Sequence, residues 1–197
     1  AQIVKELYVK ELAVHGMDQV QILSPYKVRS AAGVIEINRT IQDLVNPPIS
    51  GKKELHIHDH IFREGDKVLQ NKNTEVASNG DMGILTEISE DEDSNPLARI
   101  VFPDGRSVLY EADQMDMVEH ANAITIHKSQ GNECQVVIIP WVWAFYKMLK
   151  RNILYTGITR AKQKVYLVGE KKAITVAIKQ ESTGTRNTIL AERIRYY

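Results

Sequence analysis

Side chains able to do chemistry are concentrated between residues 127 and 133. This segment reads His-Lys-Ser-Gln-Gly-Asn-Glu and places an imidazole, an ammonium, a hydroxyl, two amides and a carboxylate around one glycine. Short β-branched apolar runs flank it at 124–126 and 136–139, a pattern typical of strands buried on both faces of a parallel sheet. Ligands of open α/β sheets bind in loops that leave the carboxyl ends of such strands. The segment therefore predicts a ligand-binding loop.

A second chemical segment follows at residues 151–162, which read Arg-Asn-Ile-Leu-Tyr-Thr-Gly-Ile-Thr-Arg-Ala-Lys, before a strand-like run at 164–169. Its apolar positions recur at helical spacing and predict a helix with one buried side: Ile153, Leu154, Ile158 and Ala161. Thr159, Arg160 and Lys162 then stand at the end of this segment, beside the next strand.

The two segments together resemble motifs V and VI of superfamily 1 helicases, and within them the RecD-like and TraA-like 5'-to-3' DNA helicases. The matching residues are Thr-x-His-Lys-Ser-Gln-Gly-x-Glu, starting at Thr125, and Leu-Tyr-Thr-x-Ile-Thr-Arg-Ala-Lys, starting at Leu154. The resemblance implies an α/β fold, the RecA-like second motor domain of P-loop-NTPase type, in which helices flank a parallel sheet. It also implies an ATP-dependent DNA helicase related to the alpha subunit of exodeoxyribonuclease V.

A polar loop at residues 24–33 separates a predicted buried strand at 20–23 from a predicted helix that Asn46-Pro47-Pro48 ends. The loop resembles helicase motif IV, a strand, a Ser-Pro turn and a Gly-x-x-x-(Leu/Ile)-Asn helix. The matching residues are Ser24, Pro25, Gly33, Ile37 and Asn38. In that family a cation after the strand reaches the ATP phosphates. Lys27 and Arg29 both qualify, and the sequence does not choose between them.

The resemblance assigns the nucleotide contacts to four further residues. Arg160 is the expected arginine finger, offered to the triphosphate from across a cleft between two domains. Gly131 and Glu133 are expected to approach the nucleotide, with the carboxylate meeting the ribose hydroxyls and Gln130 beside them. No metal ligand is expected in this chain.

The resemblance also places single-stranded DNA across the top of the sheet. The residues expected to touch its backbone are Ser24, Pro25, Thr125, His127 and Lys128. Phosphate contacts carry no sequence information, which suits a motor that must step over any sequence.

The sequence contains no Gly-x-x-x-x-Gly-Lys-(Ser/Thr) loop to cradle phosphates and no acidic pair after a strand for magnesium. We therefore expect ATP and Mg²⁺ to be bound mainly by an N-terminal RecA-like domain of the same polypeptide, and the chain alone to be inactive. Other repair or recombination subunits are further expected partners by resemblance. The 5'-to-3' direction follows from the resemblance alone.

Between residues 62 and 118 the pattern changes to short β-like runs at 67–70, 83–88, 98–102 and 107–110. Asn79-Gly80 and Asp104-Gly105 are tight-turn signals, and the second predicts a hairpin. We expect a small barrel inserted into the α/β domain, and the segments at 65–68 and 79–83 resemble the SH3-like insertion of RecD-like helicases. The expected domains are thus 1–61, 62–118 and 119–197.

Composition limits the function classes. The chain has 197 residues, 43% of them hydrophobic, which suffices for one ordinary core and a small satellite domain. Its 25 basic and 25 acidic residues cancel, which is unusual for a DNA-binding protein, but acidic residues cluster at 87–93 and basic ones at 147–172. A single cysteine excludes an internal disulfide, and no apolar stretch suits a membrane span or signal segment. We expect a cytoplasmic protein that does not enter the membrane.

Several residues have a structural and a functional interpretation. His56, His58 and His60 would share one face of an extended strand, but without cysteine or carboxylate partners we expect an exposed strand rather than a metal site. Trp141, Trp143 and Phe145 could stack on bases, yet their apolar surroundings favour packing. The remaining expected elements are a helix at 3–14, one after Gly169 and a closing helix with Ile189, Leu190 and Ile194.

Two other function classes remain open at this point. The chain could be a nucleic-acid-binding module without catalysis, in which the inserted barrel does the binding, or a protein-interaction domain derived from a helicase. The combination of Thr159, Arg160, Gly131 and Glu133 favours the motor, because only a nucleotide requires all of them.

Overall fold

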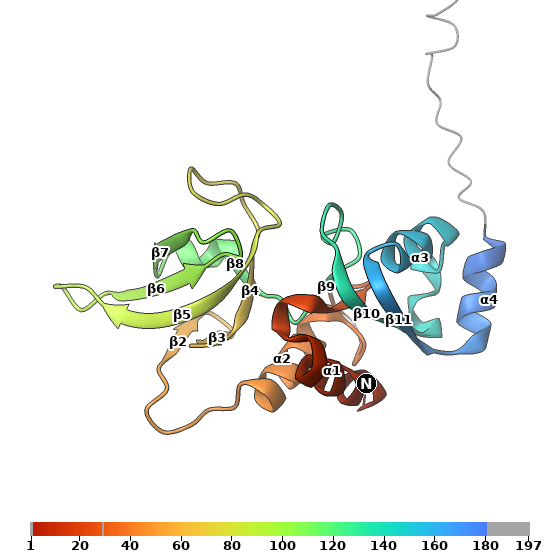
Figure 1. Ribbon diagram of the computed structural model, residues 1–197, viewed down its shortest axis with the longest axis horizontal. Coiled ribbons are helices and arrows are strands. Elements are labelled where there is room, and N and C mark those ends of the chain that lie inside the picture. The colour runs from red at the N-terminus through yellow and green to blue at the C-terminus, as the bar shows by residue number, and fades with distance from the viewer. Residues whose placement is uncertain (1, 29, 181–197) are drawn as a thin grey trace, which may run out of the picture.

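A computed structural model describes residues 2–28 and 30–180, and its larger part is built on a parallel sheet (Figure 1). Four strands pair in the order β11-β10-β1-β9, all of them parallel. Their bounds are β1 Val20–Ser24, β9 Ala123–Thr125, β10 Cys134–Trp141 and β11 Ala161–Gly169. The two apolar runs around the polar loop are therefore parallel strands, as predicted, and β1 lies between them.

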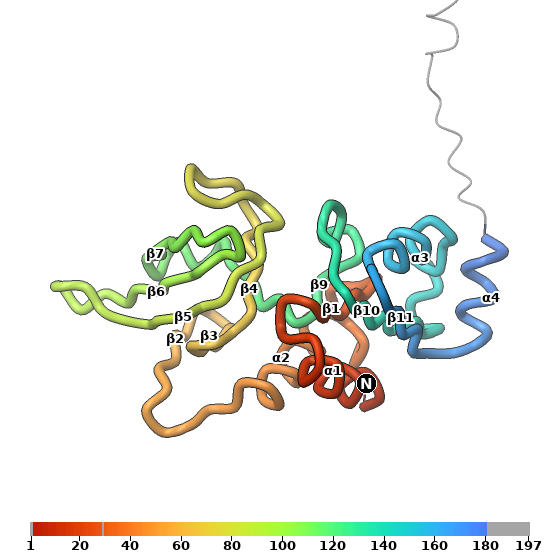
Figure 2. Tube along the Cα trace, viewed as in Figure 1, coloured from red at the N-terminus to blue at the C-terminus, as the bar shows by residue number. Residues whose placement is uncertain are grey.

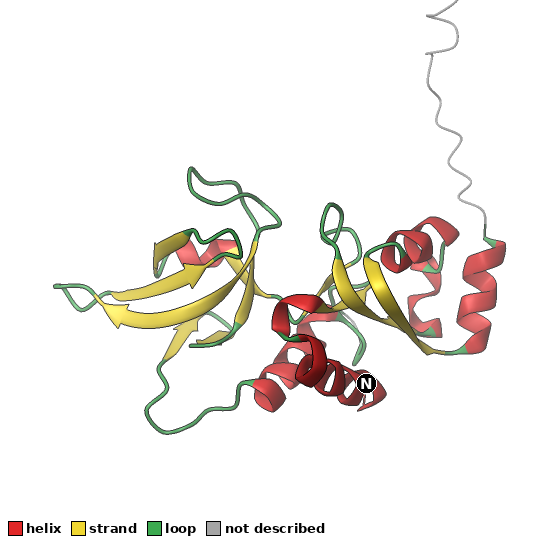
Figure 3. Ribbon diagram, in the orientation of Figure 1, coloured by secondary structure: helices red, strands yellow, loops and turns green. Residues whose placement is uncertain are grey.

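Helices cover both faces of this sheet (Figure 3). The helices are α1 Gln2–His15, α2 Val34–Val45, α3 Arg151–Ile158 and α4 Lys171–Lys179, with 3₁₀ helices at Met17–Gln19, Gln114–Met117 and Trp143–Met148. Val136 and Ile138 pack with α1 and α2, whereas Val137 and Ile139 pack with α3 and α4. Because alternate residues enter separate cores, β10 needs an unbroken apolar run. None of the described helices is long and apolar enough to cross a bilayer.

The smaller part is an antiparallel sheet with strand order β7-β6-β5-β4-β8 and a separate β2–β3 hairpin. The bounds are β2 Glu54–Ile57, β3 His60–Arg63, β4 Lys67–Gln70, β5 Met82–Glu90, β6 Pro96–Val101, β7 Ser107–Glu111 and β8 Val118–His120. It has its own core, which includes Phe62, Leu85 and Ile100. The predicted Asp104-Gly105 hairpin is present, with Gly105 at φ +87° and its N–H donating to the Phe102 carbonyl at 3.0 Å. The α/β fold with an inserted β-barrel-like sheet is thus confirmed.

The predicted histidine strand at 56–60 is wrong. His58 lies in the turn of the β2–β3 hairpin, with φ at +50°, so the three imidazoles do not share one face. His58 pairs instead with Asp116 at 3.0 Å, and His56 with Glu54 at 3.7 Å. The described residues contain no group of three or more His, Cys, Asp or Glu side chains placed to hold a metal.

The second chemical segment is less helical than predicted. Helix α3 ends at Ile158, which is 40% exposed, because Ala161 already pairs with Cys134 at the start of β11. Arg160 therefore lies in the turn between helix and strand. Trp141 and Phe145 are buried, as predicted, and the half-exposed ring of Trp143 carries the Lys172 ammonium 4.3 Å from its centroid. The predicted closing helix lies outside the described residues.

A buried carboxylate joins the two parts of the molecule. Asp66, only 1% exposed, accepts hydrogen bonds from Gln42 Nε2 at 2.6 Å, Asn46 Nδ2 at 2.7 Å and the Arg63 backbone N–H at 2.7 Å. The His120 Nε2 atom lies 3.3 Å from the same carboxylate. Gln42 and Asn46 extend from α2 and its end, whereas Arg63 and His120 belong to the barrel strands. Helix α2 is therefore hydrogen-bonded to the barrel through one acidic group.

A buried lysine forms a second connection. Lys67 of β4 is 3% exposed, and its ammonium donates to the carbonyl oxygens of Met17 and Val20, at 2.9 and 3.2 Å, and to Gln21 Oε1 at 3.0 Å. Burial lowers the pKa of Lys67 to about 8, because the charged form is desolvated. Lys67 thus hydrogen-bonds the barrel to the beginning of β1. Folding lowers the pKa of this lysine and so makes it easier to deprotonate.

Substitution of Asp66→Asn should lower the free energy of unfolding by about 2–4 kcal/mol, since an amide cannot accept all the donors that converge on the carboxylate. Chemical denaturation measures this change, with the exposed Asp93→Asn as the control. Equal stability of both variants would contradict the junction described here.

The stability contributed at Lys67 should depend on pH. An unfolded lysine titrates near pH 10.4, so between about pH 8 and pH 10 the unfolded chain binds more protons than the folded chain, and stability gains with rising pH. The difference in free energy of unfolding between wild type and Lys67→Met should therefore move in favour of wild type over this range. The exposed Lys72→Met serves as control, and parallel pH profiles for all three proteins would rule the effect out.

Candidate functional site

The loop at 126–133 runs between the two ends of the parallel strands, a path that can be followed in Figure 2. We call the side of the sheet where the carboxyl ends of the strands meet the carboxyl edge, and the side where their amino ends meet the amino edge. Strand register shows this directly, because Thr125 is level with Ser24 at the carboxyl ends, whereas Val136 near the start of β10 is level with Val20. The loop therefore begins at the carboxyl edge of the sheet and ends at the amino edge. The predicted site residues consequently divide into two groups.

Glu133 and Arg160 form the group at the amino edge. They immediately precede β10 and β11, and both line one small cavity of about 20 Å³. A backbone hydrogen bond from the Cys134 N–H to the Arg160 carbonyl, 3.0 Å long, fixes the two strand starts together. The structure thus brings together an arginine and a carboxylate that are distant in sequence.

The Arg160 guanidinium is oriented by local contacts. Its Nε donates to the Thr156 carbonyl and its Nη2 to Thr159 Oγ1, each at 3.3 Å. In the described part of the chain it has no acidic partner within ion-pair distance. Glu133 is 56% exposed at its side chain and lies 3.7 Å from Lys162. Among residues 2–28 and 30–180, no carboxylate therefore neutralises the positive charge of Arg160.

Gly157 allows α3 to pack closely against the parallel sheet. A Cβ at this position of α3 would lie 3.0 Å from Ile139 Cδ1 and 3.4 Å from Ile126 Cδ1. Glycine costs a helix roughly 0.5–1 kcal/mol relative to alanine. Here it permits close contact between α3 and the strands, so its presence in the helix has a packing reason.

Gln130 and Gly131, in the middle of the 126–133 loop, are exposed, and Gly131 adopts φ +92°, a conformation that favours glycine. The Ser129 hydroxyl is buried and donates to the Ile126 carbonyl at 2.7 Å. Asn132 Nδ2 donates to the Gly80 carbonyl at 3.3 Å, which connects the loop to the barrel. Sequence reasoning missed this contact, although the Asn79-Gly80 turn itself was predicted.

The group at the carboxyl edge contains the residues expected to contact DNA. His127 is exposed, and Thr125 and Lys128 are partly exposed. Ser24 is fully buried, and its hydroxyl donates to the Ala32 carbonyl at 2.8 Å. Pro25 is buried as well. Ser24 and Pro25 therefore shape the 24–33 loop, and their side chains are not presented to a ligand.

Lys27 also belongs to the carboxyl edge, not to the edge with Arg160. Its ammonium donates to Glu119 Oε1 at 2.5 Å, while Lys128 donates to Glu119 Oε2 at 3.0 Å and to Asn71 Oδ1. Burial raises the pKa of the Glu119 carboxyl, but hydrogen bonds from both lysines outweigh it and leave the pKa below its usual value. Arg29, the other predicted cation, lies outside the described residues.

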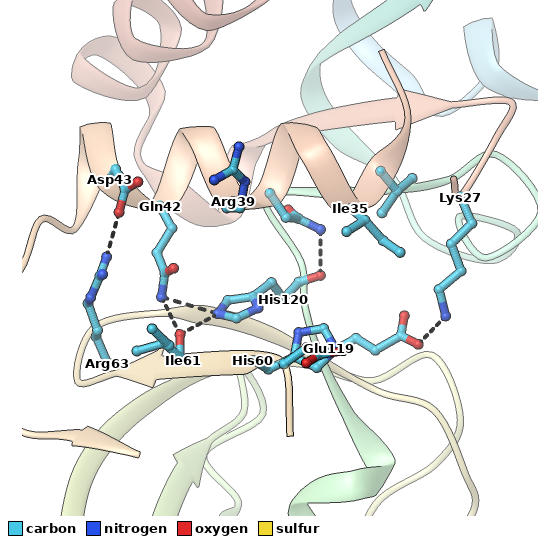
Figure 4. A pocket seen from close by; sticks show the side chains of 13 residues that line it. Lys27, Ile35, Arg39, Gln42, Asp43, His60, Ile61, Arg63, Glu119 and His120 are labelled. Carbon is cyan, nitrogen blue, oxygen red and sulfur yellow. Dashed lines mark hydrogen bonds and ion pairs between the residues drawn. The ribbon is translucent and has the colours of Figure 1, made fainter. Parts of the chain in front are cut away.

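A cavity of about 340 Å³ lies between α2 and the β2–β3 hairpin (Figure 4). Lys27 and Glu119 stand at one end of it, and Arg63 pairs with Asp43 at 3.0 Å at the other. Burial lowers the pKa of His60 in its wall. Of the predicted site residues, Lys27 alone lines this cavity among those the structure describes.

Two family models match the chain. The UvrD-like helicase C-terminal domain matches residues 120–168, and the ATP-dependent RecD-like DNA helicase SH3 domain matches residues 37–102. The first match includes the 126–133 loop and Arg160. The second begins within α2 and includes most of the barrel.

Curated relatives agree with these models. The chain is 31% identical over 192 residues to the ATP-dependent RecD2 DNA helicase of Deinococcus radiodurans, covering 96% of this chain and 25% of that protein. It is 32% identical over 123 residues to the RecBCD enzyme subunit RecD of Mycolicibacterium smegmatis, covering 59% of this chain and 19% of that subunit. The chain therefore spans a quarter or less of the length of these relatives.

Solved structures show the same fold. A Bacteroides Pif1 helicase in complex with ADP-AlF3 and single-stranded DNA superposes with a TM-score of 0.55 at 20% identity, covering 89% of this chain and 45% of that one. Bacteroides Pif1 bound to single-stranded DNA gives a TM-score of 0.51 at 16% identity, covering 75% and 40%. At these identities the likeness concerns the fold.

Proposed function

We propose, from the premise that this chain belongs to the RecD-like superfamily 1 DNA helicases and forms part of their C-terminal region, that it supplies one wall of an ATP-driven DNA motor. The observation that supports this most is the division of the site residues between two edges of one sheet. Arg160 and Glu133 lie at the amino edge, whereas His127 and Lys128 lie at the carboxyl edge. Nucleotide and DNA would thus meet opposite edges.

The amino edge has the chemistry expected of a nucleotide contact. Hydrolysis of bound ATP spreads negative charge over the transferred phosphoryl group, and a guanidinium stabilises that charge. Arg160 is held by Thr156 and Thr159 and has no carboxylate partner in the described part of the chain, which leaves its charge for a phosphate. The Glu133 carboxylate is exposed enough to accept hydrogen bonds from the ribose hydroxyls, with Gln130 and Gly131 beside it.

The remaining nucleotide contacts would come from another domain. This sequence lacks a phosphate-cradling loop, so an N-terminal RecA-like domain of the same polypeptide would hold the phosphates and Mg²⁺. Arg160 would then act across the cleft between the two domains. One curated relative is named as a subunit of the RecBCD enzyme, which makes further repair or recombination subunits additional candidate partners.

The carboxyl edge would form part of the track for single-stranded DNA. The exposed His127 imidazole, the Thr125 hydroxyl and the Lys128 ammonium can bind backbone phosphates without reading sequence. Ser24 and Pro25 would contribute by shaping the neighbouring loop. Because the 126–133 loop connects this edge with Glu133, a shift caused by nucleotide can move the DNA contacts.

Arg160→Ala should lower ATP turnover about a thousandfold in the polypeptide that joins this chain to its N-terminal domain, because the charge on the phosphoryl group loses its guanidinium. DNA affinity should change little, since Arg160 lies at the edge away from His127 and Lys128. The matched control is Arg99→Ala, which removes an arginine from the barrel surface. Equal loss of turnover and DNA binding would point to a structural role for Arg160.

The 197-residue chain alone should release no phosphate from ATP, with or without DNA, because the groups that would hold the triphosphate are not in its sequence. A phosphate-release assay on the purified chain measures this, with Arg160→Ala as the reference. Turnover that disappears in the Arg160→Ala variant would show that this chain carries a complete site.

A further inference from the structure

One carboxylate on the barrel, Glu119, pairs with Lys128 of the proposed DNA track and also with Lys27. Glu119 lies in β8, Lys27 in the loop after β1 and Lys128 in the loop after β9. Each carboxylate oxygen accepts a hydrogen bond from one ammonium: Oε1 from Lys27 Nζ at 2.5 Å and Oε2 from Lys128 Nζ at 3.0 Å. Three segments that are distant in sequence thus meet at one anionic group.

This arrangement has the chemistry of a phosphate site. A backbone phosphodiester, like a carboxylate, carries one negative charge over two free oxygens, and two ammonium groups can bind those oxygens from two sides. The three side chains remain accessible, with 48% of Lys27, 31% of Lys128 and 24% of Glu119 exposed. A phosphodiester can therefore reach the two lysines from solvent.

We propose that Lys27 and Lys128 form one binding site for a backbone phosphodiester of single-stranded DNA. This inference rests on the proposed function. Glu119 occupies this site until the DNA displaces it. Lys27 thereby acts on the DNA and not on the nucleotide phosphates, because it shares a carboxylate with Lys128 at the edge away from Arg160.

The surroundings of Glu119 allow such a displacement. Glu119 and Lys27 both line the 340 Å³ cavity, so the released carboxylate has room to turn beside His60 (Figure 4). Glu119 is also paired with Leu69 of β4, and the next residue, His120, contacts the buried Asp66. DNA that binds the lysines would therefore act directly on the strand that joins the barrel to the parallel sheet.

The deciding experiment compares Glu119→Gln with wild type in binding to a fluorescent oligothymidylate, measured by anisotropy. Removal of the competing charge should tighten binding roughly three- to tenfold, because a charged hydrogen-bonding partner of both lysines is lost. A carboxylate that merely positions the lysines would have the opposite effect, and its loss would weaken binding. The sign of the change therefore separates the two roles.

Two sets of controls accompany this comparison. Glu87→Gln removes one negative charge from the barrel at its ion pair with Arg99, and should leave DNA affinity unchanged. Lys27→Ala and Lys128→Ala should each weaken binding. Each should also reduce the slope of log affinity against log salt concentration by about the amount that one phosphate contact contributes. In either lysine variant the gain from Glu119→Gln should shrink, because the remaining lysine alone cannot form the site.

Each outcome decides between the proposals. Weaker or unchanged binding by Glu119→Gln, in a protein whose DNA binding needs Lys128, would overturn the role of Glu119 and leave the DNA track intact. Unchanged binding by Lys27→Ala would overturn the shared phosphate site, and this test stands even if Glu119→Gln fails to fold. No DNA binding by wild type or any variant would contradict the proposed function itself.

Discussion

The buried Asp66 carboxylate is the interaction on which the relation between the two parts of this molecule depends. It accepts hydrogen bonds from α2 through Gln42 and Asn46 and contacts the barrel through Arg63 and His120. An unpaired buried carboxylate would be costly, so these donors must stay together. The consequence is that β8, and Glu119 within it, lies at a fixed place beside the loops of the parallel sheet.

A parallel sheet gives this chain two chemically separate edges. Strand register places His127 and Lys128 at one edge and Glu133 and Arg160 at the other, although a single short loop contains three of these four residues. One domain thus carries exposed charged side chains at two separate places. Asn132 of the loop contacts the barrel at Gly80, and Lys128 contacts Glu119 and Asn71, so the carboxyl edge and its loop are connected to the barrel as well as to the parallel sheet.

Sequence periodicity predicted most of the secondary structure because the signals were local. The apolar run at 136–139 and the Asp104-Gly105 turn each depend on residues that are neighbours in the chain. The histidine strand was wrong because His58 adopts a turn that alternation alone does not reveal. Amides recur at four-residue spacing at Asn38 and Gln42 of α2 and at Asn46, its C-cap; this was a usable signal for a polar junction, and it was missed.

The sequence by itself determined the fold class and the chemistry available at the site, because strand and helix patterns and the spacing from Thr125 to Glu133 and from Leu154 to Lys162 are properties of short segments. Only the tertiary structure decided which of these residues share an edge. It buried Ser24, and it brought Lys27 to Lys128 through Glu119. The physical reason is that these contacts arise from strand order and domain packing, which act between residues far apart in the chain.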